Sequence, residues 1–198
     1  MIKVGITGNM GSGKTTVCSI FATLGIPIYD ADSRAKALMH EPRLKNQIIA
    51  IFGTEAYDLK GHLNTVHISK LAFANGDLLT QLNKAVHPVV AEDALTWHAA
   101  QQAPYTLREA ALLIESGSYK QLDQLILVTA PESIRIQRVQ MRNQWSLEEI
   151  KARMAKQMPE EEKRAFAQHF ITNDGRQSVI EQVLVIHNAL LSHAVNPS

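Results

Sequence analysis

The sequence has little of what marks secreted, membrane-spanning or nucleic-acid-binding proteins. Its 198 residues include one cysteine, Cys18, so no disulfide can form within the chain, which suits a reducing compartment. No apolar run approaches the roughly 18 residues of a membrane span. The first residues lack the regions of a signal peptide. Twenty Lys and Arg against 19 Asp and Glu leave a net charge of +1, without the basic excess of a nucleic-acid binder.

The sequence also lacks internal repeats, low-complexity tracts and Gly/Ser linkers. Its eight histidines are scattered without metal-ligand spacing, which argues against structural zinc. We therefore expect a cytoplasmic protein that folds as one domain over residues 1–198, in which only the tail 196–198 is loosely held. We expect no nucleic-acid, membrane or obligatory protein partner.

A glycine-rich segment near the N-terminus carries the strongest functional signal. Residues 8–15 read Gly-Asn-Met-Gly-Ser-Gly-Lys-Thr and match G-x-x-x-x-G-K-[ST] at every specified position. They follow a β-branched run, Ile2 to Ile6, and precede a helical spacing over Thr15 to Leu24. In such a loop, backbone N–H groups surround phosphates, the lysine neutralises phosphate oxygens and the hydroxyl binds Mg²⁺. The alternative, a plain strand-to-helix turn with a surface lysine, does not require the full motif.

This segment predicts an ATP-binding phosphate loop. Lys14 is also a candidate catalytic residue, and Thr15 is the candidate Mg²⁺ ligand. The candidate nucleotide-binding residues of the segment are Gly8, Asn9, Met10, Gly11, Ser12, Gly13, Lys14, Thr15 and Thr16.

Strand and helix signals alternate along the chain. Helix starts are indicated by capping-box spacings at Thr129, Ser146 and Ser178. Residues 33 to 102 show an interrupted helical pattern, with weak breaks at Gly53, Gly61, Gly76 and Pro88. The further strand candidates are Ile26 to Tyr29, Glu109 to Ile114, Leu125 to Val128 and His169 to Thr172. Because parallel strands need crossover connections, the alternation predicts a three-layer α/β fold with a parallel sheet and a helical insertion.

Two aspartates, Asp30 and Asp32, follow the second predicted strand. Ligands of open parallel sheets bind at the carboxyl ends of strands, so a carboxylate there could accept the proton of an attacking hydroxyl. Asp is also a favoured helix N-cap. Both interpretations stay open for Asp32, whereas a cap or turn is favoured for Asp30.

Acidic and basic side chains in the second half allow two interpretations each. Leu112 to Glu115 reads either as a degenerate Walker B strand or, slightly favoured, as a core strand ending in a capping Glu. Arg135, Arg138 and Arg142 read either as a solvated helix face or as lid arginines that contact phosphates. His87 precedes Pro88, which is favoured at helix starts, so His87 alone carries no functional signal.

The motifs follow one another in a specific order, although no single one is specific. Beyond the phosphate loop they are Asp30-Ala31-Asp32, His87-Pro88, Leu112-Leu113-Ile114-Glu115 with Ser116-Gly117, Gln137-Arg138 with Arg142, Gln157, and Asn173-Asp174-Gly175. In this order the chain resembles the dephospho-CoA kinase family. It departs from the family's usual pattern at Ala111, Ile114 and Gln168, where Pro, Phe and Asp are common.

The resemblance implies a P-loop NTPase fold with a parallel five-stranded sheet. The core would span about 1–32, 101–130 and 166–198, the helical CoA subdomain about 33–100, and the helical lid about 131–165. ATP would phosphorylate the ribose 3′-hydroxyl of dephospho-CoA with Mg²⁺, the last step of CoA biosynthesis. By the same resemblance, Asp32 would be the catalytic base, Arg138 and Arg142 would face phosphates, and Asn173 would bind the nucleotide. The residues implied at the acceptor are Asp30, Asp32, His87 and Glu115.

Two rival functions share the phosphate loop. A regulatory GTPase is suggested by Asp58-Leu59-Lys60-Gly61, which fits D-x-x-G, but no apolar strand leads into it. The segment Asn83 to Val86 begins like a guanine-reading N-K-x-D and lacks the aspartate. Another small-molecule kinase, such as a nucleotide or shikimate kinase, is the second rival. The D-x-D element and the large helical insertion favour dephospho-CoA.

Overall fold

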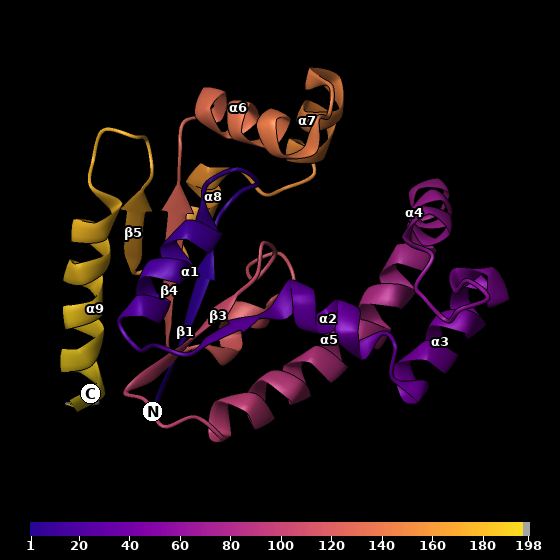
Figure 1. Cartoon of the computed structure of the whole chain (residues 1–198), viewed down its shortest axis with the longest axis horizontal. Coiled ribbons are helices and arrows are strands. Elements are labelled where there is room, and N and C mark those ends of the chain that lie inside the picture. The colour runs from indigo at the N-terminus through magenta and orange to yellow at the C-terminus, as the bar shows by residue number, and fades with distance from the viewer. Residues whose placement is uncertain (196–198) are drawn as a thin grey trace. The chain divides into compact units, whose positions relative to one another are not determined.

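The structure, a computed structural model, describes residues 1–195, so the tail predicted to be loose lies outside the described residues. Strands and helices alternate at both ends of the chain, around a helical middle (Figure 1). The chain divides into two compact units, one formed by 1–30 and 100–198 and the other by Ala31–Ala99.

The first unit is built on a five-stranded parallel sheet in the order β2-β3-β1-β4-β5. Its central strand is buried nearly throughout, as expected for a parallel strand covered on both faces. The α/β fold class predicted from the sequence is therefore confirmed. The strands are β1 (Ile2–Thr7), β2 (Ile28–Asp30), β3 (Tyr105–Glu109), β4 (Gln124–Thr129) and β5 (His169–Thr172).

Helices α1 (Lys14–Thr23) and α9 (Val179–Val195) cover one face of the sheet. Their buried residues form one apolar cluster with the strands, in which Phe21 meets the Tyr105 ring edge-on at 6.4 Å between centroids. This packing fixes the start of α1, and with it the end of the phosphate loop, against the sheet.

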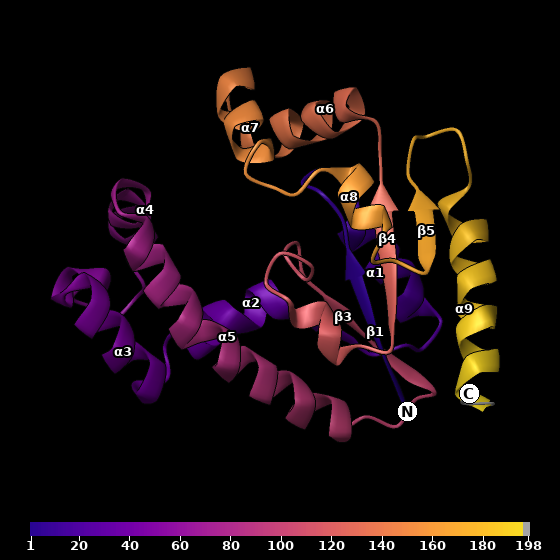
Figure 2. The same ribbon diagram turned by 180° about the vertical axis from the view of Figure 1, so that it is seen from behind.

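The other face is covered by the turns after β3 and by α8 (Glu160–Arg164), as the opposite view in Figure 2 shows. Buried Leu113 and Ile114 pack there against Leu125 of β4, with Phe166 beside them. Between β4 and α8 the chain forms α6 (Glu132–Asn143) and α7 (Leu147–Met154). Ser146 caps α7 with the predicted capping box, its side chain accepting from Glu149 N.

Two sequence predictions about elements are wrong. The strand predicted over Glu109 to Ile114 lies earlier in the chain, over Tyr105–Glu109, and turns follow it. The run Leu112 to Ile114 is apolar because two of its side chains pack on the sheet, not because it forms a strand. Pro88 neither breaks nor starts a helix, since it lies inside helix α5 (Gly76–Ala99).

The second unit contains only helices as regular elements, apart from an isolated bridge between Tyr57 and Leu63. An ion pair of 2.6 Å joins Arg34 of α2 to Asp93 of α5 within this unit. Its helices are α2 (Ala31–Leu38), α3 (Pro42–Phe52), the 3-10 turn η1 (Thr54–Ala56), α4 (Thr65–Ala74) and α5 (Gly76–Ala99). The division into core, CoA subdomain and lid stays a prediction. Over residues 1–195, the helices are too short or too polar to cross a membrane.

Candidate active site

The predicted phosphate loop lies between β1 and α1. Two of its glycines occupy positions where a larger residue would be strained. Gly11 and Gly13 have φ of 82° and 93°, in the left-handed region that favours glycine. A Cβ on Gly11 would lie 2.5 Å from the Arg135 carbonyl oxygen, and one on Gly13 would overlap the Asn173 amide. The loop therefore sits in close contact with α6 and with the segment after β5.

A cavity of about 190 Å³ opens beside the loop. Three of its lining side chains are cationic, from Lys14, Arg138 and Arg142, and it lies at the N-terminal end of α1, which favours anions. Its lining residues are Gly11, Gly13, Lys14, Thr15, Thr16, Arg138, Val139 and Arg142. The structure thus brings the predicted loop and both predicted lid arginines to one site with the charge that a polyphosphate requires.

The arginines of α6 differ in what they contact. Arg138 donates to the carbonyls of Gly11 and Ser12, both at 3.4 Å, and to both oxygens of Asn173 at 3.1 Å. Arg142 is exposed and donates to Asn143 Oδ1 at 2.8 Å. Arg135 is buried and donates to the Ala130 carbonyl, so its role is to hold the start of α6.

Asn173 braces the loop from the end of β5. Its Nδ2 donates to the Ser12 carbonyl at 2.9 Å, while its Oδ1 accepts from Arg138. Its backbone N–H bonds to Thr129 at the end of β4. The nucleotide contact predicted for Asn173 stays a prediction; in this structure its side chain joins the loop to Arg138.

Glu109 is a site residue that the sequence analysis missed. As the last residue of β3, it lies in register with Asp30 of β2, and its Oε1 accepts from the Thr15 hydroxyl at 3.5 Å. The polar residues within β3 hid the strand, whereas the apolar run after it drew the prediction to Glu115. The Tyr, Thr and Leu at its start are typical strand formers and could have revealed it.

The pKa of the buried Cys18 thiol is shifted by the charged groups at this site. Burial raises its pKa most, and the Glu109 carboxylate, which accepts a hydrogen bond from it, and Asp30 raise it further, against a lowering by Lys14. The thiol stays protonated at neutral pH, as expected for a small buried residue rather than a nucleophile.

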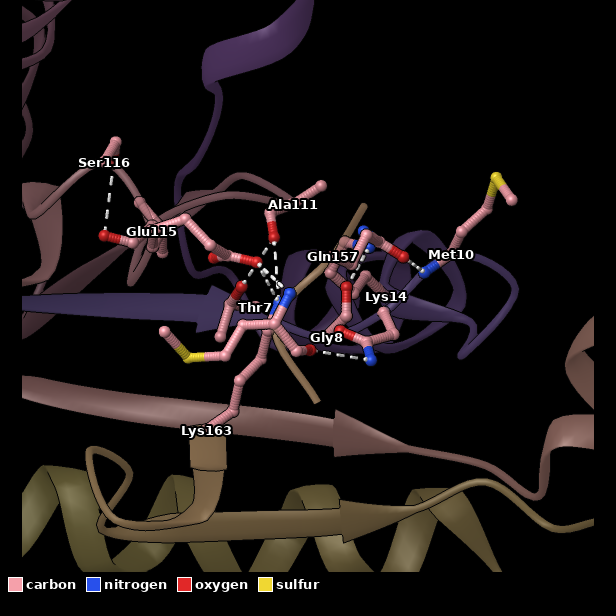
Figure 3. Close-up of polar contacts among 12 residues, drawn as sticks. Thr7, Gly8, Met10, Lys14, Ala111, Glu115, Ser116, Gln157 and Lys163 are labelled. Atoms are coloured by element: carbon pink, nitrogen blue, oxygen red, sulfur yellow. Dashed lines mark hydrogen bonds and ion pairs between the residues drawn. The ribbon is translucent and has the colours of Figure 1, made fainter. Parts of the chain in front are cut away.

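Glu115, predicted at the end of a strand, instead lies in the turns after β3 and binds Lys163. Its Oε1 accepts from Lys163 Nζ at 2.8 Å and from Met158 N at 3.3 Å. Figure 3 shows this pair beside the phosphate loop, where Lys14 Nζ donates to the Gly8 carbonyl at 2.9 Å. The acceptor contact predicted for Glu115 stays a prediction.

The remaining predicted residues are divided between the units. Asp30 ends β2 in the first unit, directly before α2. Asp32 lies in the first turn of α2, where a carboxylate is favourable, rather than at the N-cap position before it. His87 lies in α5 of the second unit. The base and acceptor roles of Asp32 and His87 stay predictions.

The site fits the Mg²⁺ that a phosphate loop implies. Among residues 1–195, no cluster of three or more His, Cys, Asp or Glu side chains could hold a metal by itself. Mg²⁺ in kinase sites needs only one or two protein oxygens besides the substrate phosphates. The Thr15 hydroxyl and the Glu109 carboxylate supply oxygens of that kind.

Comparison with known proteins agrees with this geometry. The family model described as dephospho-CoA kinase matches residues 2–178. A dephospho-CoA kinase of Porphyromonas gingivalis is 37% identical over 199 residues, covering 100% of this chain and 98% of that protein.

Solved structures agree as well. The crystal structure of a Thermus thermophilus protein has a TM-score of 0.86 at 34% identity, covering 95% of this chain and 96% of that one. Dephospho-CoA kinase from Campylobacter jejuni, 23% identical, shares the fold with a TM-score of 0.69, covering 96% and 97% of the two chains. With its glycine loop and cationic cavity, and with this likeness over its whole length, the chain belongs to the dephospho-CoA kinase family.

Proposed function

We propose that this protein transfers the γ-phosphoryl group of ATP to the ribose 3′-hydroxyl of dephospho-CoA, which yields CoA and ADP in the last step of CoA biosynthesis. The observation that carries the proposal is the cavity that the glycine loop lines together with the cationic side chains of Lys14, Arg138 and Arg142. The family match supplies the acceptor. No comparable support exists for a GTPase, whose base-reading aspartate is missing after Asn83-Lys84.

In the proposed mechanism, the acceptor oxygen attacks the γ-phosphorus while the bond to the β–γ bridging oxygen breaks and ADP leaves with the electron pair. Loop N–H groups and Lys14 hold the phosphates, and Arg142 offsets charge that spreads over the transferred group. Asn173 and the loop carbonyls orient Arg138. The Asp32 carboxylate accepts the proton of the acceptor hydroxyl.

A Mg²⁺ ion bound with ATP would neutralise phosphate charge, held by the Thr15 hydroxyl with Glu109 nearby. We further propose a cytoplasmic location, in keeping with the single cysteine. ATP and dephospho-CoA would be the partners, without nucleic acid, membrane or an obligatory protein.

The proposal is tested by turnover with a panel of acceptors. Purified protein is incubated with Mg-ATP and dephospho-CoA, AMP or shikimate, and the products are identified by mass spectrometry. We expect CoA and ADP from dephospho-CoA, with far slower reaction of the other two. Equal ATP consumption without acceptor, or a dominant product from another acceptor, would overturn the assignment.

The proposed base is tested with Asp32→Asn. Asn keeps a polar side chain in the first turn of α2 but cannot take the proton, so turnover should fall roughly 10²–10⁴-fold. The dissociation constant of Mg-ATP and the thermal midpoint of unfolding should change little. Titration calorimetry measures the first and scanning calorimetry the second. Near-normal turnover would remove Asp32 from the mechanism, whereas lost Mg-ATP binding would make it a metal-site residue.

A further inference from the structure

An ion pair outside the cavity, between buried Lys163 and partly exposed Glu115, is connected to the phosphate loop by hydrogen bonds (Figure 3). Resting on the kinase function proposed above, we infer that Lys163 is a positioning residue for this loop, which acts through the segment Gln157–Met158 on the side chain of Asn9 and the backbone N–H of Met10. Lys163 does not line the cavity, and it bonds to Glu115, for which the family resemblance implies a place at the acceptor. Its effect is to hold the first half of the loop in the shape that receives ATP.

The first step of the argument is the environment of Lys163. Its side chain is 0% exposed, and its ammonium bonds to Glu115 Oε1 at 2.8 Å and to the Ala111 carbonyl at 3.4 Å. The same carbonyl accepts from the hydroxyl of Thr7 at 3.2 Å, and Thr7 is the residue directly before the loop. A charged group is kept this deep only when fixed partners compensate it, so the positions of its partners are well determined.

The second step is the connection from the pair to the loop. Glu115 accepts from Met158 N, and the Met158 carbonyl accepts from the Asn9 side chain at 3.3 Å. Beside it, Gln157 Oε1 accepts from the backbone N–H of Met10 at 2.8 Å. The ion pair therefore holds Met158 directly and Gln157 through the peptide bond that joins them, and these two residues hold two consecutive loop residues.

The third step explains why this matters for ATP rather than for folding alone. Loop residues that are not held must be ordered when the nucleotide binds, and that entropy is then subtracted from the affinity. Loss of the Gln157–Met10 bond should weaken Mg-ATP binding about tenfold, which corresponds to about 1.4 kcal/mol. Turnover at saturating ATP should change less, because the bound loop regains its shape.

The direct test compares two glutamines that make the same kind of bond. Gln157→Met removes the bond to Met10 N. Gln168→Met is the matched control, because Gln168 Oε1 accepts from Leu125 N at 2.9 Å near the start of β4. Calorimetry without any acceptor should show about tenfold weaker Mg-ATP binding for Gln157→Met and no change for Gln168→Met. Equal affinities in the two variants would overturn the proposal.

A double-mutant cycle tests whether Lys163 acts through Gln157. Lys163→Met should lower both the thermal midpoint and the Mg-ATP affinity. In the Gln157→Met background it should lower the midpoint again but the affinity by less than in the unchanged protein, since of the two bonds only that between Met158 and Asn9 is left to lose. A purely structural lysine predicts an unchanged affinity, and independent action predicts losses that multiply; either result refutes the inference.

If Lys163→Met does not fold, Glu115→Gln replaces it in the cycle. The amide still accepts from Met158 N but weakens the pair with the ammonium. The expected pattern is the same, with a higher KM for ATP and a smaller change in kcat. Because the binding measurement uses Mg-ATP alone, failure of the dephospho-CoA assignment would leave this test intact.

Discussion

The phosphate loop and its flanking residues Thr7 and Thr16 form two halves that use polar groups in different ways. In the cavity half, Gly11 to Thr16, the side chain of Lys14 lines an open cationic cavity. In the anchored half, Thr7 to Met10, polar groups bond to the rest of the protein, ultimately to the buried Lys163. The cavity half leaves its lysine open to a ligand while Arg138 and Asn173 hold its backbone, whereas the anchored half uses its polar groups to hold the loop's shape.

The two lysines show how this division limits inference from sequence. Lys14 belongs to a motif whose chemistry requires it. Lys163 lies in the run Glu160 to Arg164, whose composition is typical of a solvated helix, yet it is among the largest fully buried side chains. Only the packing of α8 on the sheet reveals this, because burial of one residue in a charged run depends on contacts from distant segments.

The largest expected effect comes from removing the cation of the cavity half. Lys14→Ala should lower turnover by at least about 10²–10³-fold, because a fixed charge that stabilises the transition state is lost. The free energy of unfolding should stay within about 0.5 kcal/mol, since no core contact is removed. Steady-state kinetics and thermal melts check both, with exposed Lys120→Ala as the control. A large loss of stability would contradict the division of the loop.

Glu109→Gln sharpens the cavity side of the comparison. If the carboxylate helps Thr15 hold Mg²⁺, its neutral isostere should weaken apparent Mg²⁺ affinity roughly 10–100-fold, while excess Mg²⁺ restores activity. Turnover is measured against Mg²⁺ at fixed ATP. Asp123→Asn is the control, because Asp123 binds the Lys3 backbone N–H instead. An unchanged Mg²⁺ dependence would remove Glu109 from the proposed Mg²⁺ site.

The β3 error shows which part of the site the sequence could predict. The fold class and the loop follow from alternation and a local motif, whereas the two arginines follow from the family resemblance, since their spacing alone also fits a solvated helix face. The acid beside Thr15, Glu109, was not predicted, because the end of β3 depends on pairing with neighbouring strands that hydrophobicity does not show. At two of the positions that depart from the family pattern, the Ala111 carbonyl accepts from Thr7 and Lys163, and the Gln168 side chain accepts from Leu125 N.

Thr7→Val tests the anchored half with a smaller change. Valine keeps the shape of the wholly buried side chain but removes the bond to the Ala111 carbonyl, so unfolding should become easier by about 1 kcal/mol. Turnover should fall much less than in Lys14→Ala. The control is Thr129→Val, because buried Thr129 donates to the Ile171 carbonyl at the end of β5. Chemical denaturation and kinetics on both variants decide whether the anchored half contributes mainly to shape.

The smallest expected effect is the pH dependence of stability that comes from His187. Burial lowers the pKa of His187 below its usual value of about 6.5, and its Nδ1 lies 2.6 Å from the Tyr105 hydroxyl. The folded protein keeps the ring neutral, so the unfolded chain binds the extra proton first. Stability from this contact is therefore complete above about pH 6.5 and falls as the pH drops toward the lower folded pKa.

His187→Asn keeps an acceptor near the tyrosine but does not titrate. Its thermal midpoint should fall less steeply between pH 7.5 and pH 5.5 than that of the unchanged protein, a range chosen to span the roughly 6.5 reference pKa. Some slope should remain, because burial also lowers the pKa of His169, with a smaller contribution from His193. Parallel slopes for the two proteins would show that His187 is not a source of acid sensitivity. The thermal midpoints of the variants in the two loop halves could then also be compared at lower pH, without a contribution from His187.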